Sequence, residues 1–164
     1  MTQVSLEEVP RVLGPVFAAG DAAAGAKERE RGNVERIGRM VHCISQGRFD
    51  ELREQLAPDV AYEMVAPARV PWRRAARGAD QVAATIAENF ATVCEQRTQP
   101  LSLVSQGDTV MLMARETGRF VDDGAEYEVL TAQQFTFDDD GRLAEFRSVV
   151  GEVGRPGGHP DARG

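Results

Sequence analysis

Glu116 is the residue of this sequence most suited to proton transfer. It lies in the stretch 109–120, where the even positions are otherwise mostly apolar, as at Val110 and Leu112. A carboxyl group on an apolar surface has a raised pKa because burial disfavours its charged form, and general acids and bases are tuned in this way. The alternative is a structural role, in which Glu116 pairs at the rim with Arg119 or another arginine.

Further polar residues share the inner face of the expected strands, since successive side chains of a strand point to opposite faces. They are Tyr62, Gln133 and Ser148, with Thr131 as a weaker member. Polar groups on an apolar wall either bond one another or line a cavity that is open to a ligand. In the second case Glu116 and Tyr62 are candidate catalytic residues, and Gln133 and Ser148 are candidate substrate-binding residues.

Four larger side chains complete the candidate binding site. Met64, Phe135 and Phe146 lie on the apolar side of the same strands. Trp72, the single tryptophan, falls in the irregular stretch 67–78, which would overhang the pocket mouth. Its indole could stack on a flat ligand, and the alternative is a plug that seals the core.

Motifs for several other chemistries are absent from the sequence. It contains no glycine-rich phosphate loop, no G-x-S-x-G and no H-E-x-x-H. The two cysteines, Cys43 and Cys94, lack a metal-type spacing, and His42 lies off the apolar stripe of its helix. We therefore expect neither a metal nor another cofactor.

The composition is typical of one globular domain. The 164 residues are 42% hydrophobic and 27% charged and carry a net charge of −7, a field that repels phosphate backbones. A basic cluster at Arg69, Arg73, Arg74 and Arg77 is interpreted as a solvated loop rim. Because no apolar run could span a membrane and no secretory signal is visible, we expect a cytoplasmic protein without nucleic-acid or membrane partners.

Hydrophobic periodicity and turn residues predict three helices and five strands. The helices are expected at 33–46, 50–57 and 79–95, and the strands at 59–66, 99–105, 109–120, 126–137 and 142–150. Asn33 is the expected N-cap of the first helix. Helices followed by hairpin-linked strands indicate an α+β fold, with a curved antiparallel sheet that carries its helices on one face.

The chain divides into three parts on this interpretation. Residues 1–32 form an N-terminal arm and spacer that is helical in part, 33–151 form the domain, and 152–164 form a flexible Gly/Pro-rich tail. The alternative for the first segment is a frayed terminus. A further hypothesis is that this segment packs on a partner or regulates access to the pocket.

Three segments resemble the nuclear-transport-factor-2-like superfamily, and within it the SnoaL-like polyketide cyclases and ketosteroid isomerase. They are ISQGRFDELREQLAPDVAYEMVAP (44–67), RGADQVAATIAENF (77–90) and QQFTFDDDGRLAEFRSVVG (133–151). The resemblance covers about residues 33–151. It implies a cone-shaped α+β barrel wrapped by three helices, usually dimeric, whose open end holds a mostly apolar small-molecule pocket.

Several family acid–base positions carry other residues in this sequence. The general base of ketosteroid isomerase falls on Met64, its helix tyrosine on about Met40 and its aspartate on Gln133. Because methionine cannot take a proton, ordinary steroid isomerisation is not expected. The limonene epoxide hydrolase pattern is matched at Tyr62, but further positions fall on Met64 and Ser148, so water activation is not expected either.

Two functions agree with these residues. The first is an acid–base isomerase, cyclase or dehydratase for a hydrophobic polyketide-, steroid- or terpenoid-like compound, in which Glu116 moves a proton while Tyr62 and Gln133 hold a substrate oxygen. The alternative is a non-catalytic ligand-binding or dimerisation module of the same fold. A homodimer is expected in either case, and Met111 and Met113 with Arg115 and Arg119 on the outer sheet face would suit its contact. The alternative is an ordinary mixed surface on which arginine stems cover the methionines.

Overall fold

The computed structural model describes residues 21–68 and 70–152. Its helices are α2 Asp21–Ser45, α3 Phe49–Glu54 and α4 Ala79–Ala91. Its strands are β1 Leu56–Val65, β2 Ala75–Arg77, β3 Val93–Gln106, β4 Thr109–Phe120, β5 Glu126–Phe137 and β6 Leu143–Glu152. Residues 1–20 of the expected arm, Arg69 of the basic cluster and the tail from residue 153 lie outside the described residues.

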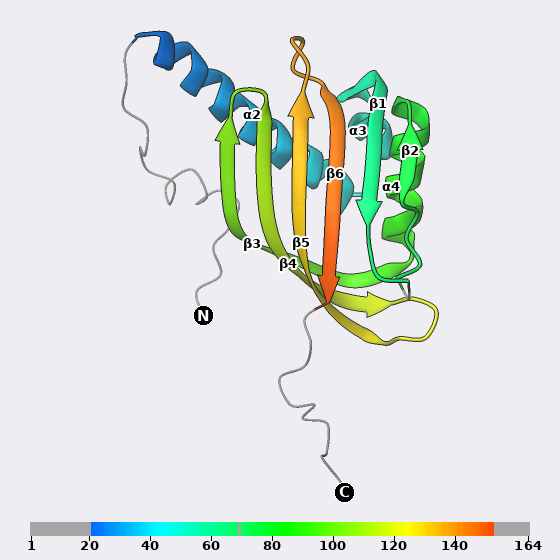
Figure 1. The fold of residues 1–164 in the computed structure, drawn as a ribbon. Coiled ribbons are helices and arrows are strands. Elements are labelled where there is room, and N and C mark those ends of the chain that lie inside the picture. The colour runs from blue at the N-terminus through cyan, green and yellow to red at the C-terminus, as the bar shows by residue number, and fades with distance from the viewer. Residues whose placement is uncertain (1–20, 69, 153–164) are drawn as a thin grey trace, which may run out of the picture.

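The six strands form one curved sheet in the order β2-β1-β6-β5-β4-β3, and the three helices lie behind its inner face (Figure 1). This confirms the predicted α+β fold. Two details differ from the expectation: the sheet does not close, and β1 runs parallel to β6 in an otherwise antiparallel sheet. The parallel pair is possible because a long connection containing α4 and four further strands returns the chain in the same direction.

Helix α2 starts earlier than predicted, at Asp21. Asn33 is therefore a residue within the helix, and its prediction as the N-cap is wrong. Its buried side chain donates from Nδ2 to the carbonyl of Gly107 over 3.1 Å, and the amide of Gly107 in turn bonds Oε1 of Glu30 over 3.0 Å. These contacts dock α2 on the β3–β4 turn, a tertiary role that its local sequence does not reveal.

The segment after β1 is more regular than expected. Within the stretch 67–78, the short strand β2 pairs with β1, for example Ala76 with Tyr62. Helix α4 ends at Ala91 and not at residue 95, because β3 already pairs with β4 at Val93. The predicted bounds of β4 and β5 are confirmed.

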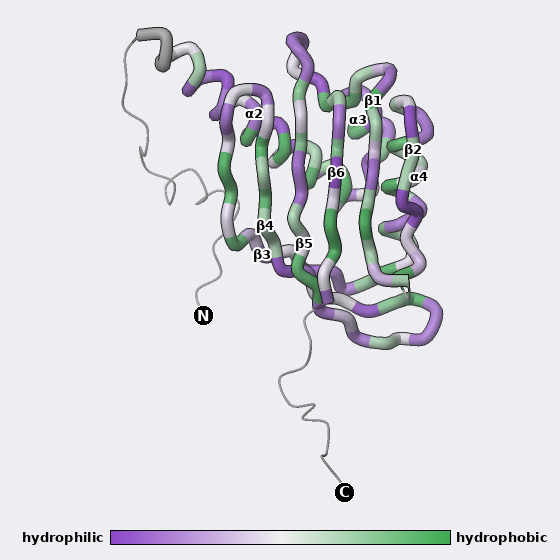
Figure 2. Tube along the Cα trace, in the orientation of Figure 1, coloured by the Kyte–Doolittle hydropathy of each residue, from purple (hydrophilic) through white to green (hydrophobic). Residues whose placement is uncertain are grey.

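The main core lies between the inner face of the sheet and the helices. Its fully or almost fully buried members come from each layer: Ile37 of α2, Leu52 of α3, Val82 of α4, Val60 of β1 and Val110 of β4. Hydrophobic and hydrophilic residues alternate along the strands (Figure 2). In the described part of the chain, no helix combines the length and apolarity that crossing a membrane requires.

The predicted inner face of β4 is confirmed. Its even positions are buried, namely Val110, Leu112, Ala114 and Glu116. Met111 and Met113 are exposed on the opposite face. Strand alternation therefore places Glu116 on the side of the sheet that the helices cover.

Candidate functional site

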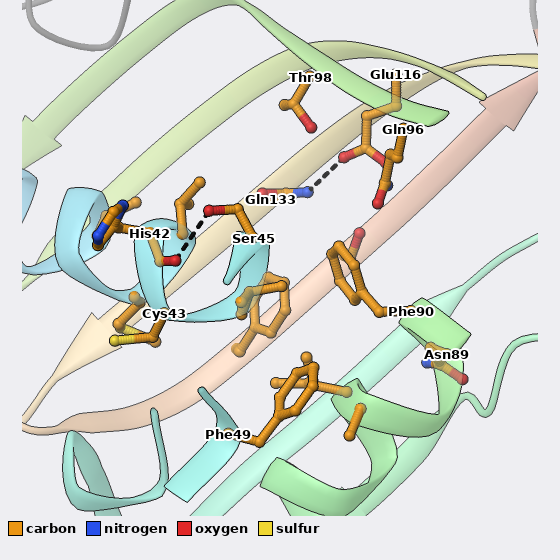
Figure 3. Close-up of a pocket in the computed structure, with 18 of the residues that line it drawn as sticks. His42, Cys43, Ser45, Phe49, Asn89, Phe90, Gln96, Thr98, Glu116 and Gln133 are labelled. Atoms are coloured by element: carbon orange, nitrogen blue, oxygen red, sulfur yellow. Dashed lines mark hydrogen bonds between the residues drawn. The ribbon is translucent and has the colours of Figure 1, made fainter. Parts of the chain in front are cut away.

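A cavity of about 1330 Å³ lies between the inner face of the sheet and the helices. It is lined by side chains from the three helices and five of the strands, part of which are drawn in Figure 3. All eight residues that the sequence proposed for a site line this one cavity: Tyr62, Met64, Trp72, Glu116, Gln133, Phe135, Phe146 and Ser148.

Glu116 is held by three neutral donors. Nε2 of Gln133 donates to its Oε1 over 3.3 Å, and the Thr131 hydroxyl lies 3.5 Å from the same oxygen. Nε2 of Gln96 donates to Oε2 over 3.2 Å. The three donors come from β5 and β3, the two strands beside β4. Figure 3 shows Gln96 and Gln133 beside the carboxyl group of Glu116.

The environment of Glu116 favours its neutral form. Only 8% of its surface is exposed, and this burial raises the pKa of the carboxyl group, while the bonds from Gln96, Thr131 and Gln133 act against the shift. The rim ion pair considered from the sequence does not form, because Arg119 pairs with Glu95 and Glu126 instead. Within the described residues, no cation forms a salt bridge with Glu116.

Tyr62 provides the second polar group of the cavity. Its hydroxyl oxygen accepts a bond from Nδ2 of Asn89 over 3.3 Å, and its proton faces Sδ of Met64 at 3.8 Å. Burial raises the pKa of Tyr62 to about 12, with a smaller contribution from Glu116. The phenol is therefore a protonated donor at neutral pH, and its only acceptor among the described residues is a weak sulfur acceptor.

Asn89 is fixed by the segment before β2. Its Oδ1 accepts from the backbone amide of Arg73 over 2.7 Å, and its Nδ2 also donates to the Arg73 carbonyl over 3.1 Å. This clamp joins α4 to the connection after β1 and sets the position of the Tyr62 hydroxyl. Asn89 was not predicted, although its spacing from Val82 and Ile86 places it on the inward face of α4.

Trp72 belongs to the cavity wall and to the smaller apolar cluster of Val70, Val129 and Val150. Its Nε1 donates to Oγ1 of Thr92 over 3.0 Å, and its ring meets that of Tyr127 edge-on at 6.1 Å. The indole is thus held in place and still leaves a large cavity beside it.

The remaining predicted residues form an apolar wall with one hydroxyl group. The rings of Phe135 and Phe146 stack with centroids 4.7 Å apart, and Tyr62 lies 5.4 Å from Phe146. Ser148 is buried in this wall and lines the cavity. A flat hydrophobic molecule could pack on the paired rings.

The cavity is also lined by residues that were not predicted as site residues. His42, Cys43 and Ser45 come from the end of α2, and Phe90 from α4 (Figure 3). Ser45 bonds the His42 carbonyl over 2.9 Å, so its hydroxyl is already used. His42 is exposed, as expected for a residue off the apolar stripe of its helix.

Tyr127 lies beside this site with a buried hydroxyl that has no hydrogen-bond partner in the described structure. Its ring crosses Gly118, its partner on β4, so closely that an added Cβ there would lie 2.8 Å from the hydroxyl. Burial raises the pKa of this phenol as well. Among residues 21–68 and 70–152, no group of His, Cys, Asp or Glu is placed to hold a metal ion.

One known protein family matches this chain. The family model described as SnoaL-like domain matches residues 37–146. A comparison with curated protein sequences gives no match.

Several solved structures share the fold. A candidate SnoaL-like polyketide cyclase from Jannaschia sp. CCS1 is 24% identical, with a TM-score of 0.63 over 74% of this chain and 86% of its own. An LEH-like epoxide hydrolase from M. tuberculosis is 17% identical, with a TM-score of 0.57 over 77% and 84%. RV0760c from Mycobacterium tuberculosis, in complex with estradiol-17beta-hemisuccinate, is 16% identical, with a TM-score of 0.59 over 71% and 92%.

Proposed function

Because the chain belongs to the SnoaL-like family of the nuclear-transport-factor-2-like superfamily, we propose that it is an acid–base enzyme for a hydrophobic small molecule. The reaction is an isomerisation, a cyclisation or a dehydration. One observation carries this proposal: the buried carboxyl group of Glu116 opens on a large apolar cavity and is held by neutral donors alone. Burial raises the pKa of such a carboxyl group above its ordinary value, which suits a general acid or base.

The count of hydrogen bonds indicates which oxygen of Glu116 reacts. A carboxylate oxygen can accept about two bonds. Gln133 and Thr131 both point at Oε1, whereas Gln96 alone bonds Oε2. Oε2 therefore keeps one acceptor position for a proton of the substrate.

The proposed chemistry begins with a carbon acid next to a carbonyl group. Ionised Glu116 takes the proton from this carbon, the C–H electron pair forms a C=C bond, and the carbonyl π pair moves to the oxygen. The Tyr62 hydroxyl donates to that enolate oxygen, since its bond to Met64 is weak. Protonated Glu116 then returns its proton to another carbon in an isomerisation, or to the alkoxide formed when the enolate attacks a second carbonyl in a cyclisation.

The cavity wall supports a polycyclic, polyketide-, steroid- or terpenoid-like substrate. Phe135 and Phe146 form a stacked pair, and Trp72 offers an aromatic surface on another side. RV0760c, a structural neighbour, is in complex with a steroid ester. Thr98, Gln96 and the Glu116 group supply the polar end at which an oxygenated ring would be oriented.

The second candidate is a ligand-binding protein without catalysis. It is favoured by Met64 and Met40, which occupy positions where ketosteroid isomerase carries acid–base residues, and by the amide Gln133 at the position of its acid. In that case the cavity binds the same class of compound, and Glu116 contributes affinity only.

A thermal-shift screen followed by turnover assays separates the two functions. Purified protein is tested with planar phenols, steroids, polycyclic polyketide analogues and terpene epoxides. A ligand at about 100 times its Kd adds roughly 2.7 kcal/mol and should raise the Tm by about 5–10 °C. Compounds that shift the Tm are then incubated with the wild-type protein, Glu116→Gln and Glu128→Gln, and the products are analysed.

Glu128→Gln is the matched control because this exposed carboxylate faces Arg115 on the outer side of the sheet. Turnover that is lost in Glu116→Gln and kept in Glu128→Gln supports the enzyme. Binding without product in the wild-type protein supports the non-catalytic alternative. A screen without any shift would contradict both functions for these compound classes.

We further propose that a second copy of the chain covers the outer face of the sheet. Met113, Ala132 and Val149 are neighbours across β4, β5 and β6 and form an exposed apolar row. Sedimentation should show a dimer that Met113→Glu dissociates. Val121→Glu, at an exposed residue beyond the end of β4, should leave the dimer intact.

A further inference from the structure

Strand β3 contains an irregularity beside Glu116. The pairing of β3 with β4 shifts register between Cys94 and Arg97, which indicates a bulge. Glu95 within it has a φ of 53°, in the left-handed region that residues with a side chain rarely adopt. Such a conformation is unfavourable and persists where the surrounding structure imposes it, often at functional sites.

The bulge directs the Gln96 side chain toward Glu116. Gln96 is half-buried and lines the cavity, whereas Glu95 borders the cavity with an exposed side chain and Arg97 is exposed and does not line it. Its Nε2 lies 3.2 Å from Oε2 of Glu116 (Figure 3). Without the bulge, the side chains of β3 would alternate regularly between the two faces of the sheet, and β3 would have no additional residue opposite β4 at this place.

Gln96 bonds a different oxygen of Glu116 from the one that the other two donors bond. Gln133 and Thr131 share Oε1, and Gln133 also bonds Thr131 over 3.4 Å, so these two residues support each other. Gln96 is the sole protein donor to Oε2 among the described residues. It therefore acts on the oxygen that is left with a free acceptor position.

We propose that Gln96 is a positioning residue for Glu116: its amide fixes the rotation of the carboxyl group, directs the free lone pair of Oε2 into the cavity and stabilises the ionised form. This inference rests on the proposed function, since it assigns Gln96 to the group that moves the proton. The bulge at Glu95 is the backbone feature that delivers the amide.

Other titratable groups lie near Glu116 or line the same cavity. Tyr62 of β1 and Tyr127 of β5 interact with it electrostatically, and burial raises the pKa of both phenols, so they are neutral at physiological pH. Cys94 of β3 lines the same end of the cavity. Glu95 of β3 lines the cavity as well, and the helices contribute further titratable groups to its wall: Glu35, Arg39, His42 and Cys43 of α2, Glu51 of α3, and Arg48 just before α3.

The test is a titration of the Glu116 carboxyl group by NMR in protein with ¹³C-labelled glutamate, where Glu116→Gln assigns the signal. Gln96→Leu should move its midpoint to higher pH, because the donor to the ionised form is lost. Gln96→Lys should move it to lower pH, because it adds a positive charge next to Oε2.

Gln99→Leu and Gln99→Lys are the matched controls. Gln99 lies on the same strand, pairs with Arg115 and does not line the cavity. Both controls should leave the midpoint unchanged. If Gln96→Leu does not fold, Gln96→Met removes the same donor with a side chain of similar length.

The proposal is overturned if the Gln96 variants leave the midpoint where the wild-type protein has it, or if the Gln99 variants move it equally. Its failure is distinguishable from failure of the proposed function. A shifted midpoint in Gln96→Leu, together with unchanged turnover in Glu116→Gln, would keep the positioning role and refute the catalytic role. An unshifted midpoint, with turnover lost in Glu116→Gln, would do the reverse.

Discussion

Gln133 donates from Nε2 to Oε1 of Glu116 over 3.3 Å, across the pairing of β5 with β4. Both side chains face the helices, and within residues 21–68 and 70–152 the carboxylate has no salt bridge. The proton affinity of Glu116 is thus set by burial on one side and by amide and hydroxyl donors on the other. The balance makes this carboxyl group sensitive to small changes in its neighbours.

Glu116→Gln should stabilise the protein more at alkaline pH than at acidic pH. The pKa of Glu116 in the folded protein is raised above its ordinary value of 4.5. The stability that Glu116 contributes in its protonated form is therefore fully present below pH 4.5 and is lost as the pH rises through the folded pKa. A tenfold difference in proton affinity between the folded and unfolded states corresponds to about 1.4 kcal/mol. Urea unfolding at pH 4.5 and pH 8 measures the difference between variant and wild type. A difference that is equal at both pH values would contradict this account.

The tyrosines should resist ionisation in the folded protein. The chain has two, Tyr62 and Tyr127. The pKa of Tyr62 is raised from 10.0 to about 12, and that of Tyr127 is raised as well. Phenolate absorbance should therefore stay low at pH 10 and rise only as the pH approaches 12, where the protein loses stability. In guanidinium both should titrate near 10, and a folded transition at 10 would refute the burial of these hydroxyls.

Gly118 and Tyr127 should respond in opposite directions. Tyr127→Phe removes a buried hydroxyl without a partner and should raise the free energy of unfolding by about 1 kcal/mol. Gly118→Ala places a methyl group 2.8 Å from that hydroxyl and should lower it by about 1–3 kcal/mol. Gly151→Ala is the control, because its Cβ would lie 3.7 Å from the nearest atom. Equal effects of the two alanine variants would contradict the packing of Tyr127 on Gly118.

Trp72 should report ligand binding by its fluorescence. It is the single tryptophan of the chain, it is 8% exposed, and it lines the cavity. A ligand that raises the Tm should therefore change the emission in a saturable way. Trp72→Phe should abolish the signal and keep the thermal shift. Ligands that stabilise the protein without altering the emission would place their site elsewhere.

Local signals in the sequence predicted the hairpin strands well. The turns at 106–108, 121–125 and 138–141 contain Asp and Gly, and β4 and β5 between them alternate clearly, so both their bounds and the inward direction of Glu116 could be predicted. Seven of the eight proposed site residues lie on strands and share one cavity because that alternation is a purely geometric rule, whereas Trp72 reaches the same cavity from the segment before β2.

Features that depend on distant contacts could not be predicted. The start of α2 depends on Asn33 and Glu30 meeting the β3–β4 turn, far away in sequence. Gln96 enters the cavity through a bulge that no glycine or proline marks. The segment that leads into β2 is likewise held by a distant residue, because the backbone of Arg73 bonds the Asn89 side chain of α4.

Strand β6 is the last of the six along the chain, yet it lies inside the sheet between β1 and β5. It brings Phe146, Ser148 and Val150 to the cavity wall. During synthesis on the ribosome, one side of β1 therefore stays unpaired until β6 has emerged. The pairing of β1 with β6 is long-range, and such pairings form slowly. A nascent chain that lacks β6 also lacks this wall of the cavity. A ligand that binds the cavity can therefore stabilise the fold only after β6 has been translated.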